Sequence, residues 1–340
     1  MIDGHYSTSV QTPLPILGAG SWGTALGLHL SRLGQHIPLW TFEKEHIESM
    51  QKEKMNTRYM PGQPFPDTLL PMADLSAAIK DAKDILIAVP SVAFRKLLTQ
   101  LQPLLTPETG IIWATKGLDE TSGQLLHEVA EEMLGKTHPY AILSGPSYAK
   151  EVAAGLPTAV VIASRHKACA ERLSERFNSP FFRVYLSNDM TGVEIGGAVK
   201  NVIAIATGIA DGMGFGTNAR CALITRGLAE ITRLGLSLGG HYETFTGLTG
   251  LGDLVLTCTD NQSRNRRFGL YLGEGLSADA AANKIGQVVE GKRNAELVLQ
   301  LADKMNVEMP ISEAVWKILQ GKITAKQAMQ ELLSRALKSE

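Results

Sequence analysis

Near its start the chain places one apolar stretch at helical spacing between two short apolar runs. The first run ends at Leu17, and apolar side chains then recur every three or four residues from Thr24 to Leu33. A second apolar run covers residues 36–42. This pattern predicts a strand, a helix over residues 24–33 and a second strand. Because Pro15 has no amide hydrogen for a central strand, we expect the first strand to be short at its start.

Strand and helix patterns alternate in this way as far as residue 187. The run at residues 84–90 is almost wholly apolar, as in a parallel strand buried on both faces. Further strands are predicted at 111–115, 140–143, 158–163 and 181–186, and helices at 43–58, 91–101, 124–134, just before Gly155 and at 166–178. A loop rich in proline and glycine is predicted at 56–66. The alternation predicts an α/β fold with a Rossmann-type, doubly wound parallel sheet.

The pattern changes near residues 187–189, and no strand is predicted after residue 191. Residues 192–212 are apolar around nearly the whole helix, which is typical of a helix in a buried core. A second helix is predicted at 218–236, and amphipathic helices from Ala278 to the C-terminus. The chain is therefore interpreted as a disordered tail (1–12), a Rossmann domain (13–187) and an all-α, substrate-binding C-terminal domain (188–340). A site is expected between the two domains, at the carboxyl ends of the strands.

A G-x-G-x-x-G motif, formed by Gly18, Gly20 and Gly23, joins the first strand to its helix. The first glycine permits a tight turn, the second lets the backbone approach a pyrophosphate, and the third lets the helix pack close to the sheet. Such a motif alone is often an ordinary turn. The correct strand and helix on either side favour dinucleotide binding.

Composition narrows the class of protein further. The 340 residues are 44% hydrophobic and 20% charged, and their formal net charge is −1, so no global charge favours nucleic acid or an anionic membrane. Three distant cysteines lack the spacing of metal ligands and favour a reducing compartment. No signal core or uninterrupted membrane span is found. We expect a cytoplasmic protein, not embedded in a membrane, with a small-molecule substrate, no nucleic-acid partner and no metal.

Lys200 lies within an otherwise apolar helical segment, next to Asn201. A helical lysine usually extends its ammonium to the surface. Here apolar residues lie on every side, so the ammonium is expected to meet an anion, a dipole or a cleft. Burial would lower its pKa toward the range that suits proton transfer, and Asn201 could orient a hydroxyl group.

Two further ionisable residues have both an ordinary and a functional interpretation. Lys116 follows a predicted strand, at the edge where α/β sheets bind ligands, yet a lysine before a glycine is more often a turn residue. Asp253 follows a glycine-rich stretch and could either cap the next helix or position a lysine.

The segment from Ser263 to Arg267 is the densest basic cluster in the sequence. Such a run usually forms a solvated surface, and it is too short for a nucleic-acid patch. One or two guanidinium groups here could instead bind a phosphate, which is the interpretation we favour.

Seven stretches, in order, resemble bacterial-type NAD(P)-dependent glycerol-3-phosphate dehydrogenases. They are GAGSWGTAL (18–26), ATKGL (114–118), LSGPSYA (143–149), GGAVKNVIA (196–204), GLGDL (250–254), SRNRRFG (263–269) and VVEG (288–291). The resemblance implies reversible hydride transfer between sn-glycerol 3-phosphate and NAD(P)+, giving dihydroxyacetone phosphate. It further suggests the reductive direction, which would supply phospholipid synthesis, and a homodimer.

The resemblance also implies a role for each matched residue. Lys200 would transfer the proton of the C2 hydroxyl, Lys116 would polarise the oxygen, and Asp253 would belong to the same catalytic network. The implied cofactor contacts are Gly18, Gly20, Ser21, Trp22, Gly23, Phe42, Lys116, Ala149, Arg264, Val288 and Glu290. The implied substrate contacts are Lys116, Gly145, Ser147, Lys200, Asn201, Asp253, Ser263, Arg264 and Asn265.

Cofactor preference depends on the end of the second strand, where relatives that prefer NADPH often carry a basic residue or histidine. Here Phe42 is followed by Glu43 and Lys44. Glu43 could bind the ribose 2′-hydroxyl, or it could be a favourable charge at a helix start. Lys44 or Arg58 could meet a 2′-phosphate. We expect use of both cofactors, with NADPH modestly preferred.

Three alternatives remain at this point: another two-domain dehydrogenase of the 3-hydroxyacid or 6-phosphogluconate type, a non-catalytic dinucleotide sensor, and a nucleic-acid binder. The basic cluster and the turn at 144–147 argue against the first. The matched Lys116, Lys200 and Asp253 argue against a protein without catalytic activity.

Overall fold

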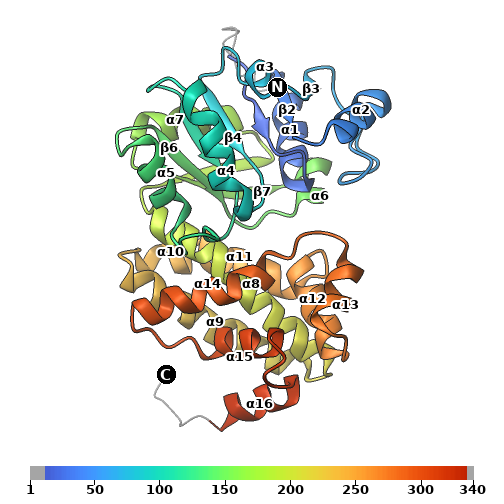
Figure 1. Cartoon of the computed structure of the whole chain (residues 1–340), viewed down its shortest axis with the longest axis vertical. Coiled ribbons are helices and arrows are strands. Elements are labelled where there is room, and N and C mark those ends of the chain that lie inside the picture. The colour runs from blue at the N-terminus through green and yellow to red at the C-terminus, as the bar shows by residue number, and fades with distance from the viewer. Residues whose placement is uncertain (1–11, 335–340) are drawn as a thin grey trace.

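The structure, a computed structural model, describes residues 12–334. A sheet with helices on both faces is followed by a helical region, and the two lie one above the other in Figure 1. The predicted tail at 1–12 lies outside the described residues except for Thr12, whose carbonyl oxygen accepts a hydrogen bond from Arg176 Nη2 at 2.8 Å. The domain bounds predicted at 13–187 and 188–340 stay a prediction.

Eight strands form one sheet in the order β3-β2-β1-β4-β5-β6-β7-β8. They are β1 (Ile16–Leu17), β2 (Ile37–Trp40), β3 (Leu69–Met72), β4 (Asp84–Ile87), β5 (Gly110–Trp113), β6 (Tyr140–Ser144), β7 (Thr158–Ala163) and β8 (Phe182–Ser187). β1 has only two residues, as the proline before it predicts. The sequence pattern missed β3, an edge strand in which only Leu69 is buried and which contains Pro71.

The sheet is parallel except at one pair, so the expectation of a parallel sheet needs one correction. β7 pairs antiparallel with β6, whereas β8 pairs parallel with β7. The link from β6 to β7 holds only the six-residue helix α6 (Ala149–Ala154), which packs on another helix, α1 (Ser21–Arg32). The chain therefore re-enters the sheet from the edge at which β6 ended.

Two apolar cores cover the two faces of the sheet. One is built with α1, α6 and α7 (Lys167–Phe177), and the other with α3 (Leu75–Ala78), α4 (Ser91–Leu101) and α5 (Leu126–Leu134). Helix α2 (Lys44–Glu53) follows β2. Burial on both faces explains why the central strands β4 and β5 are almost continuously apolar.

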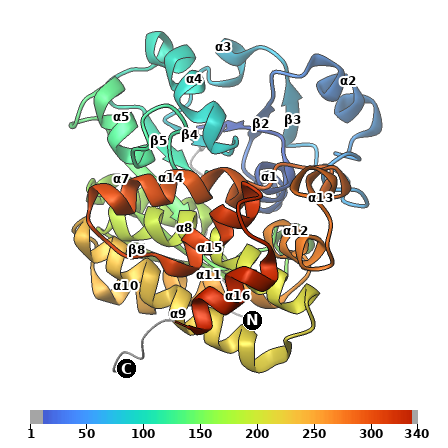
Figure 2. The same ribbon diagram turned by 60° about the horizontal axis from the view of Figure 1, so that its bottom comes forward.

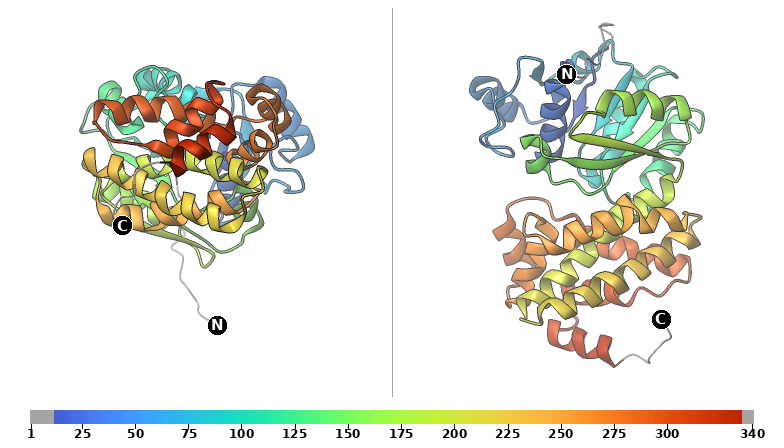
Figure 3. Two further views of the ribbon diagram at one scale, coloured as in Figure 1. Left: turned by 90° about the horizontal axis from the view of Figure 1, so that it is seen from below. Right: turned by 180° about the vertical axis from the view of Figure 1, so that it is seen from behind.

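The helical region is organised around α8 (Met190–Gly212), which Figure 3 shows rising to the boundary with the sheet. The other helices are α9 (Gly216–Ser237), α10 (Tyr242–Thr246), α11 (Asp253–Thr259), α12 (Arg264–Gly273), α13 (Ala278–Ile285), α14 (Glu290–Lys304), α15 (Pro310–Leu319) and α16 (Ala325–Leu333). Helix α8 is long and apolar enough to cross a membrane by composition, but its apolar window is fully buried inside the protein. The prediction of a buried core helix is confirmed.

No bounds were predicted for α10, α11 or α12, and for the last two the reason is visible in their sequence. A glycine-rich π-helical turn (Leu248–Gly252) leads into α11, and α12 begins with three arginines among its first four residues. Neither stretch shows a clear apolar period of 3.6 residues. Within residues 12–334 no strand follows β8, as expected.

The glycines of the turn between β1 and α1 differ in their surroundings. Gly18 has a φ of 122°, and a Cβ placed on Gly23 would lie 1.9 Å from the Gly18 carbonyl oxygen. A Cβ on Gly20 would meet no atom within 4 Å. Gly18 and Gly23 are thus required by the turn itself, whereas Gly20 leaves a surface above the helix start that a ligand can approach.

The Gly23→Ala variant should be less stable than the parent, although alanine usually favours a helix over glycine. The overlap with the Gly18 carbonyl should cost about 1–3 kcal/mol in free energy of unfolding. Urea denaturation measures this, with Gly20→Ala as the matched control that should unfold like the parent. Equal stability of the two variants would contradict the packing described for Gly23.

Candidate active site

The carboxyl ends of the central strands face the helical region (Figure 1). The predicted ionisable residues Lys116, Lys200 and Asp253 contact one another at this boundary. Lys116 follows β5, and Gly145 follows β6. From the other side, α8 contributes Lys200 and α11 contributes Asp253. The site therefore lies between the two parts of the chain, where the sequence predicts it.

One buried carboxylate binds both lysines. Lys116 Nζ donates to Asp253 Oδ2 at 2.6 Å, and Lys200 Nζ donates to Asp253 Oδ1. Lys116 also donates to the Gly145 carbonyl oxygen at 3.3 Å. Asp253 is 1% exposed and Lys200 6%, whereas the side chain of Lys116 is 19% exposed. Of the three side chains, that of Lys116 is thus the most accessible.

Asp253 does not cap its helix, which decides between the two interpretations of this residue. It is the first residue of α11, the capping position belongs to Gly252, and no side chain caps the helix. The preceding π-helical turn approaches α8 closely because Gly196 has no side chain, and a Cβ there would lie 2.5 Å from the Thr249 carbonyl oxygen. The carboxylate is thereby carried to the lysines.

Thr257 completes the cluster and was not singled out from the sequence. Its hydroxyl accepts a hydrogen bond from Lys200 Nζ at 3.0 Å and donates to the Asp253 carbonyl oxygen at 2.6 Å. The available signal was its spacing, because a residue four positions after Asp253 lies on the same helix face.

The electrostatics suit Lys200 for proton transfer. Burial lowers the pKa of Lys200 to about 7, Asp253 raises it in part, and the charge of Lys116 lowers it. Burial would raise the pKa of Asp253, but the two lysines outweigh it and hold that pKa below its ordinary value. The carboxylate therefore stays ionised while Lys200 can change its charge near neutral pH.

The basic cluster separates into structural and available groups. Arg266 is buried and binds Asp211, Asn261 and the Cys258 carbonyl oxygen, so it serves the fold. Arg264 Nη1 donates to Gln287 Oε1 at 3.1 Å, and burial lowers its pKa. Arg267 lies three residues further along α12, on the same helix face, and its buried Nε has no hydrogen-bond partner within the described part of the chain.

Other predicted substrate contacts bind one another. Asn265 Nδ2 donates to Asn201 Oδ1 at 2.9 Å, and Asn265 Oδ1 accepts from the Gly291 amide at 2.9 Å. The Ser263 hydroxyl caps α12 by accepting from the Arg266 amide. Ser147 Oγ donates to the Gly145 carbonyl oxygen at 3.0 Å. The two contacts of Asn265 connect the starts of α12 and α14 to α8.

On the cofactor side, Ser21 and Trp22 begin α1, where helical N–H groups lack partners within the helix. Sequence reasoning missed Asn56, which is fully buried and donates to the Ala19 carbonyl oxygen at 2.9 Å and to Thr24 Oγ1 at 2.8 Å. It attaches the 56–66 loop to the glycine turn. Ala149 begins α6, which packs on α1.

The remaining predicted cofactor residues belong to other segments. One of these, the end of β2, lies beside the turn because the Gly18 amide donates to the Trp40 carbonyl oxygen at 2.8 Å. Phe42 is 76% exposed after β2, and Val288 is 41% exposed before α14. Glu43 pairs with Arg58 at 2.6 Å, so these two charges neutralise each other. Glu290 Oε2 accepts from Ser91 Oγ at 3.2 Å, and burial raises the pKa of Glu290.

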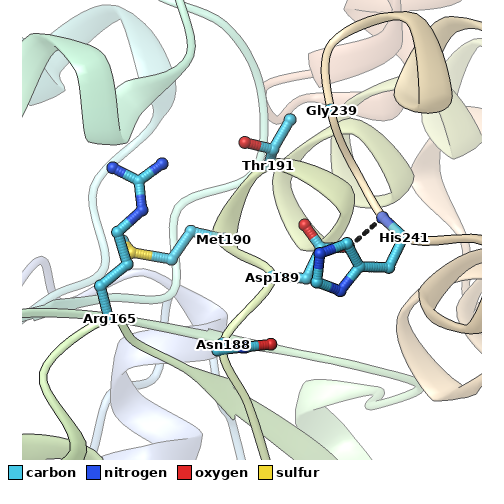
Figure 4. Close-up of a pocket in the computed structure, with 7 residues that line it drawn as sticks. All are labelled: Arg165, Asn188, Asp189, Met190, Thr191, Gly239 and His241. Carbon is cyan, nitrogen blue, oxygen red and sulfur yellow. Dashed lines mark hydrogen bonds between the residues drawn. The ribbon is translucent and has the colours of Figure 1, made fainter.

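A separate polar pocket of about 370 Å³ opens at the start of α8 (Figure 4). Its Asp189 carboxylate is already bound by the amides of Gly192 and His241 and by the Thr244 hydroxyl. Arg165 in the same pocket pairs with Glu131 at 2.6 Å. Asp189 lies eleven residues before Lys200, about 16 Å along the helix, so this pocket is separate from the lysines.

Two family models together match most of the chain. Residues 13–170 match the N-terminal part, and residues 189–330 the C-terminal part, of NAD-dependent glycerol-3-phosphate dehydrogenase. The chain belongs to this family. The resemblance seen in the sequence is thus confirmed, and with it the dehydrogenase activity and the use of NAD(P). The family match decides against the other dehydrogenase types.

Individual relatives match this chain over almost their whole length. A protein of Haemophilus ducreyi named glycerol-3-phosphate dehydrogenase (NAD(P)+) is 52% identical over 335 residues, which cover 98% of this chain and 100% of the relative. A crystal structure of glycerol-3-phosphate dehydrogenase from Coxiella burnetii is 53% identical, has a TM-score of 0.94, and covers 96% of this chain and 100% of its own. The yeast enzyme matches with a TM-score of 0.81 at 26% identity, covering 95% of this chain and 99% of its own.

Within residues 12–334 no three or more histidine, cysteine, aspartate or glutamate side chains gather as metal ligands would.

Proposed function

We propose that Lys200 and Lys116 carry the proton chemistry by which this dehydrogenase interconverts sn-glycerol 3-phosphate and dihydroxyacetone phosphate. The observation that supports this is the pair of ammonium groups on one buried carboxylate, at the carboxyl ends of the strands. As an ammonium, Lys200 donates a proton to the ketone oxygen during reduction. As a neutral amine, it accepts the C2 hydroxyl proton during oxidation.

Lys116 and Asp253 have supporting roles in this proposal. Lys116, the more exposed ammonium, contacts the C2 oxygen and stabilises the negative charge that develops on it. Asp253 keeps both lysines in place and remains ionised. The residues fit a bound dinucleotide, which supplies or accepts the hydride, because the open surface above Gly20 and the start of α1 can receive its pyrophosphate.

The substrate phosphate is assigned to the start of α12. Arg264 offers a guanidinium that is partly buried, and Arg267 lies beside it with an Nε that has no hydrogen-bond partner among residues 12–334. A dianion would satisfy both groups and would also meet the helix start that Ser263 caps. Asn201 and Asn265, which already bind each other, orient the glycerol end next to Lys200.

We further propose a cellular role for the reductive direction of this reaction. Reduction in the cytoplasm would supply glycerol 3-phosphate for phospholipid synthesis. The enzyme would act as a homodimer. NADPH would be used modestly better than NADH, because Arg58 neutralises Glu43, the carboxylate nearest in sequence to the end of β2.

Lys200→Met should lower kcat by a factor of about 10²–10⁴, because the proton donor is lost while the apolar stem is kept. Steady-state kinetics with saturating dihydroxyacetone phosphate measures the change. NADH affinity, followed by protein fluorescence, should stay within about twofold. Retention of more than a third of the parent kcat would contradict the role of Lys200 in proton transfer.

Arg264→Ala should cost about 2–5 kcal/mol in kcat/KM for dihydroxyacetone phosphate, since a partly buried dianion loses a charge-assisted partner. Unphosphorylated dihydroxyacetone, a poor substrate for either protein, should react almost equally with both. Arg183→Ala, which removes an exposed arginine of β8, is the charge-matched control and should behave like the parent. Equal losses with both substrates would show that Arg264 does not bind the phosphate.

The ratio of kcat/KM for NADPH to that for NADH should be about ten, equivalent to roughly 1.4 kcal/mol. Arg58→Ala should reduce this ratio, because it leaves Glu43 unpaired against the 2′-phosphate. Both cofactors are compared at one ionic strength. A strong preference for NADH that disappears in Glu43→Ala would show instead that Glu43 binds the ribose.

A further inference from the structure

Helix α14 runs along the boundary between the sheet and the helical region (Figure 2). Its first turns make three side-chain contacts with the sheet side. Glu290 accepts from Ser91, Asn294 accepts from the Leu118 amide, and Arg293 pairs with Glu120 on the surface at 3.2 Å. Two of these contacts reach the segment that directly follows Lys116.

Asn294 is the most deeply buried of these contacts. Its side chain is 0% exposed, and its Oδ1 accepts from the Leu118 amide at 3.3 Å. Its Nδ2 is buried and has no partner among the described residues. A buried, unpaired amide donor costs stability, so a position that served packing alone would be better filled by an apolar side chain.

The Asn294 side chain also packs against the turn that carries Lys116. Gly117 has a φ of 138°, and a Cβ there would lie 3.0 Å from both amide atoms of Asn294 and 2.9 Å from Ser91 Oγ. The turn is thus enclosed by α14 on one side and by the start of α4 on the other. Groups from both parts of the chain therefore restrict the backbone of this turn. They thereby restrict the position of the Lys116 Cα, from which its side chain extends.

We propose that Asn294 is a positioning residue that holds the turn of Lys116, Gly117 and Leu118, so that the Lys116 ammonium stays on Asp253 beside Lys200. This inference rests on the proposed roles of the two lysines. Within residues 12–334, Asn294 makes no hydrogen bond with Lys200 or Asp253, and it acts through the backbone of the turn. Because a misplacement of about 1 Å can cost up to 100-fold in rate, a loose turn should be visible in kcat.

The pH profile offers a readout that a merely structural role would not change. The charged or titratable groups that face Lys200 are Asp253 and Cys258 on α11 and Lys116 after β5. Of these, Lys116 lowers the pKa of Lys200. If the turn loosens and Lys116 moves away, the pKa of Lys200 should rise, and ketone reduction should persist to higher pH.

The test compares three substitutions at this position. Asn294→Leu keeps most of the volume but removes the acceptor, Asn294→Ala removes both, and Asn294→Asp keeps an acceptor oxygen. We expect the Leu and Ala variants to lose about tenfold in kcat and to show the alkaline limb of their reduction profile at higher pH. Asn294→Asp should recover most of the rate. Gln300→Ala removes an exposed amide from the same helix and should match the parent.

The double variant with Lys116→Met separates this inference from the proposed function. If Asn294 acts through Lys116, then Asn294→Ala should cause no further loss of kcat in the Lys116→Met background. A normal rate for Lys116→Met alone would overturn the proposed role of Lys116. A low rate for Lys116→Met combined with a normal rate and pH profile for Asn294→Leu would overturn the role of Asn294 only, as would full additivity of the two changes.

Discussion

A single buried carboxylate shared by two ammonium groups is the constraint on which the site depends. Asp253 is almost fully buried, and each of its oxygens binds a different lysine. Removing Asp253 would leave the buried ammonium of Lys200 without its partner carboxylate, which is costly. The cluster carries one net positive charge while both lysines are protonated, and that excess favours loss of a proton from the more buried Lys200. A ketone oxygen that gains negative charge would meet the same positive excess.

The fold brings these three residues together from distant parts of the chain. Lys116 lies just after the end of β5, Lys200 lies in the middle of α8, and Asp253 lies at the start of α11. Helix α8 can place a lysine in an apolar interior because the helices around it bury its whole circumference. The glycine turn at β1, by contrast, is built within one strand–helix unit, with open space beside Gly20.

The sequence alone allows much of this to be predicted, and the gaps have physical causes. Apolar spacing identifies α8 and the central strands because they are buried on every side. It misses β3, whose edge position leaves most of it uncovered, and α11 and α12, whose starts are rich in glycine or arginine. Lys200 stands out as a charge among apolar residues. Asn56 and Asn294 do not, because each depends on a backbone group far away in the chain. The antiparallel β7 depends on where α6 packs, which local pattern cannot show.

The central claim is that burial and the neighbouring Lys116 bring the pKa of the Lys200 ammonium into the physiological range. Its direct test is a titration of that ammonium by NMR of ¹³C- and ¹⁵N-labelled lysine side chains, with the signal assigned by its loss in Lys200→Arg. We predict a midpoint near the expected pKa of about 7 in the parent, and a higher one in Lys116→Met. A midpoint near the ordinary lysine value of about 10.4 in the parent would contradict the account.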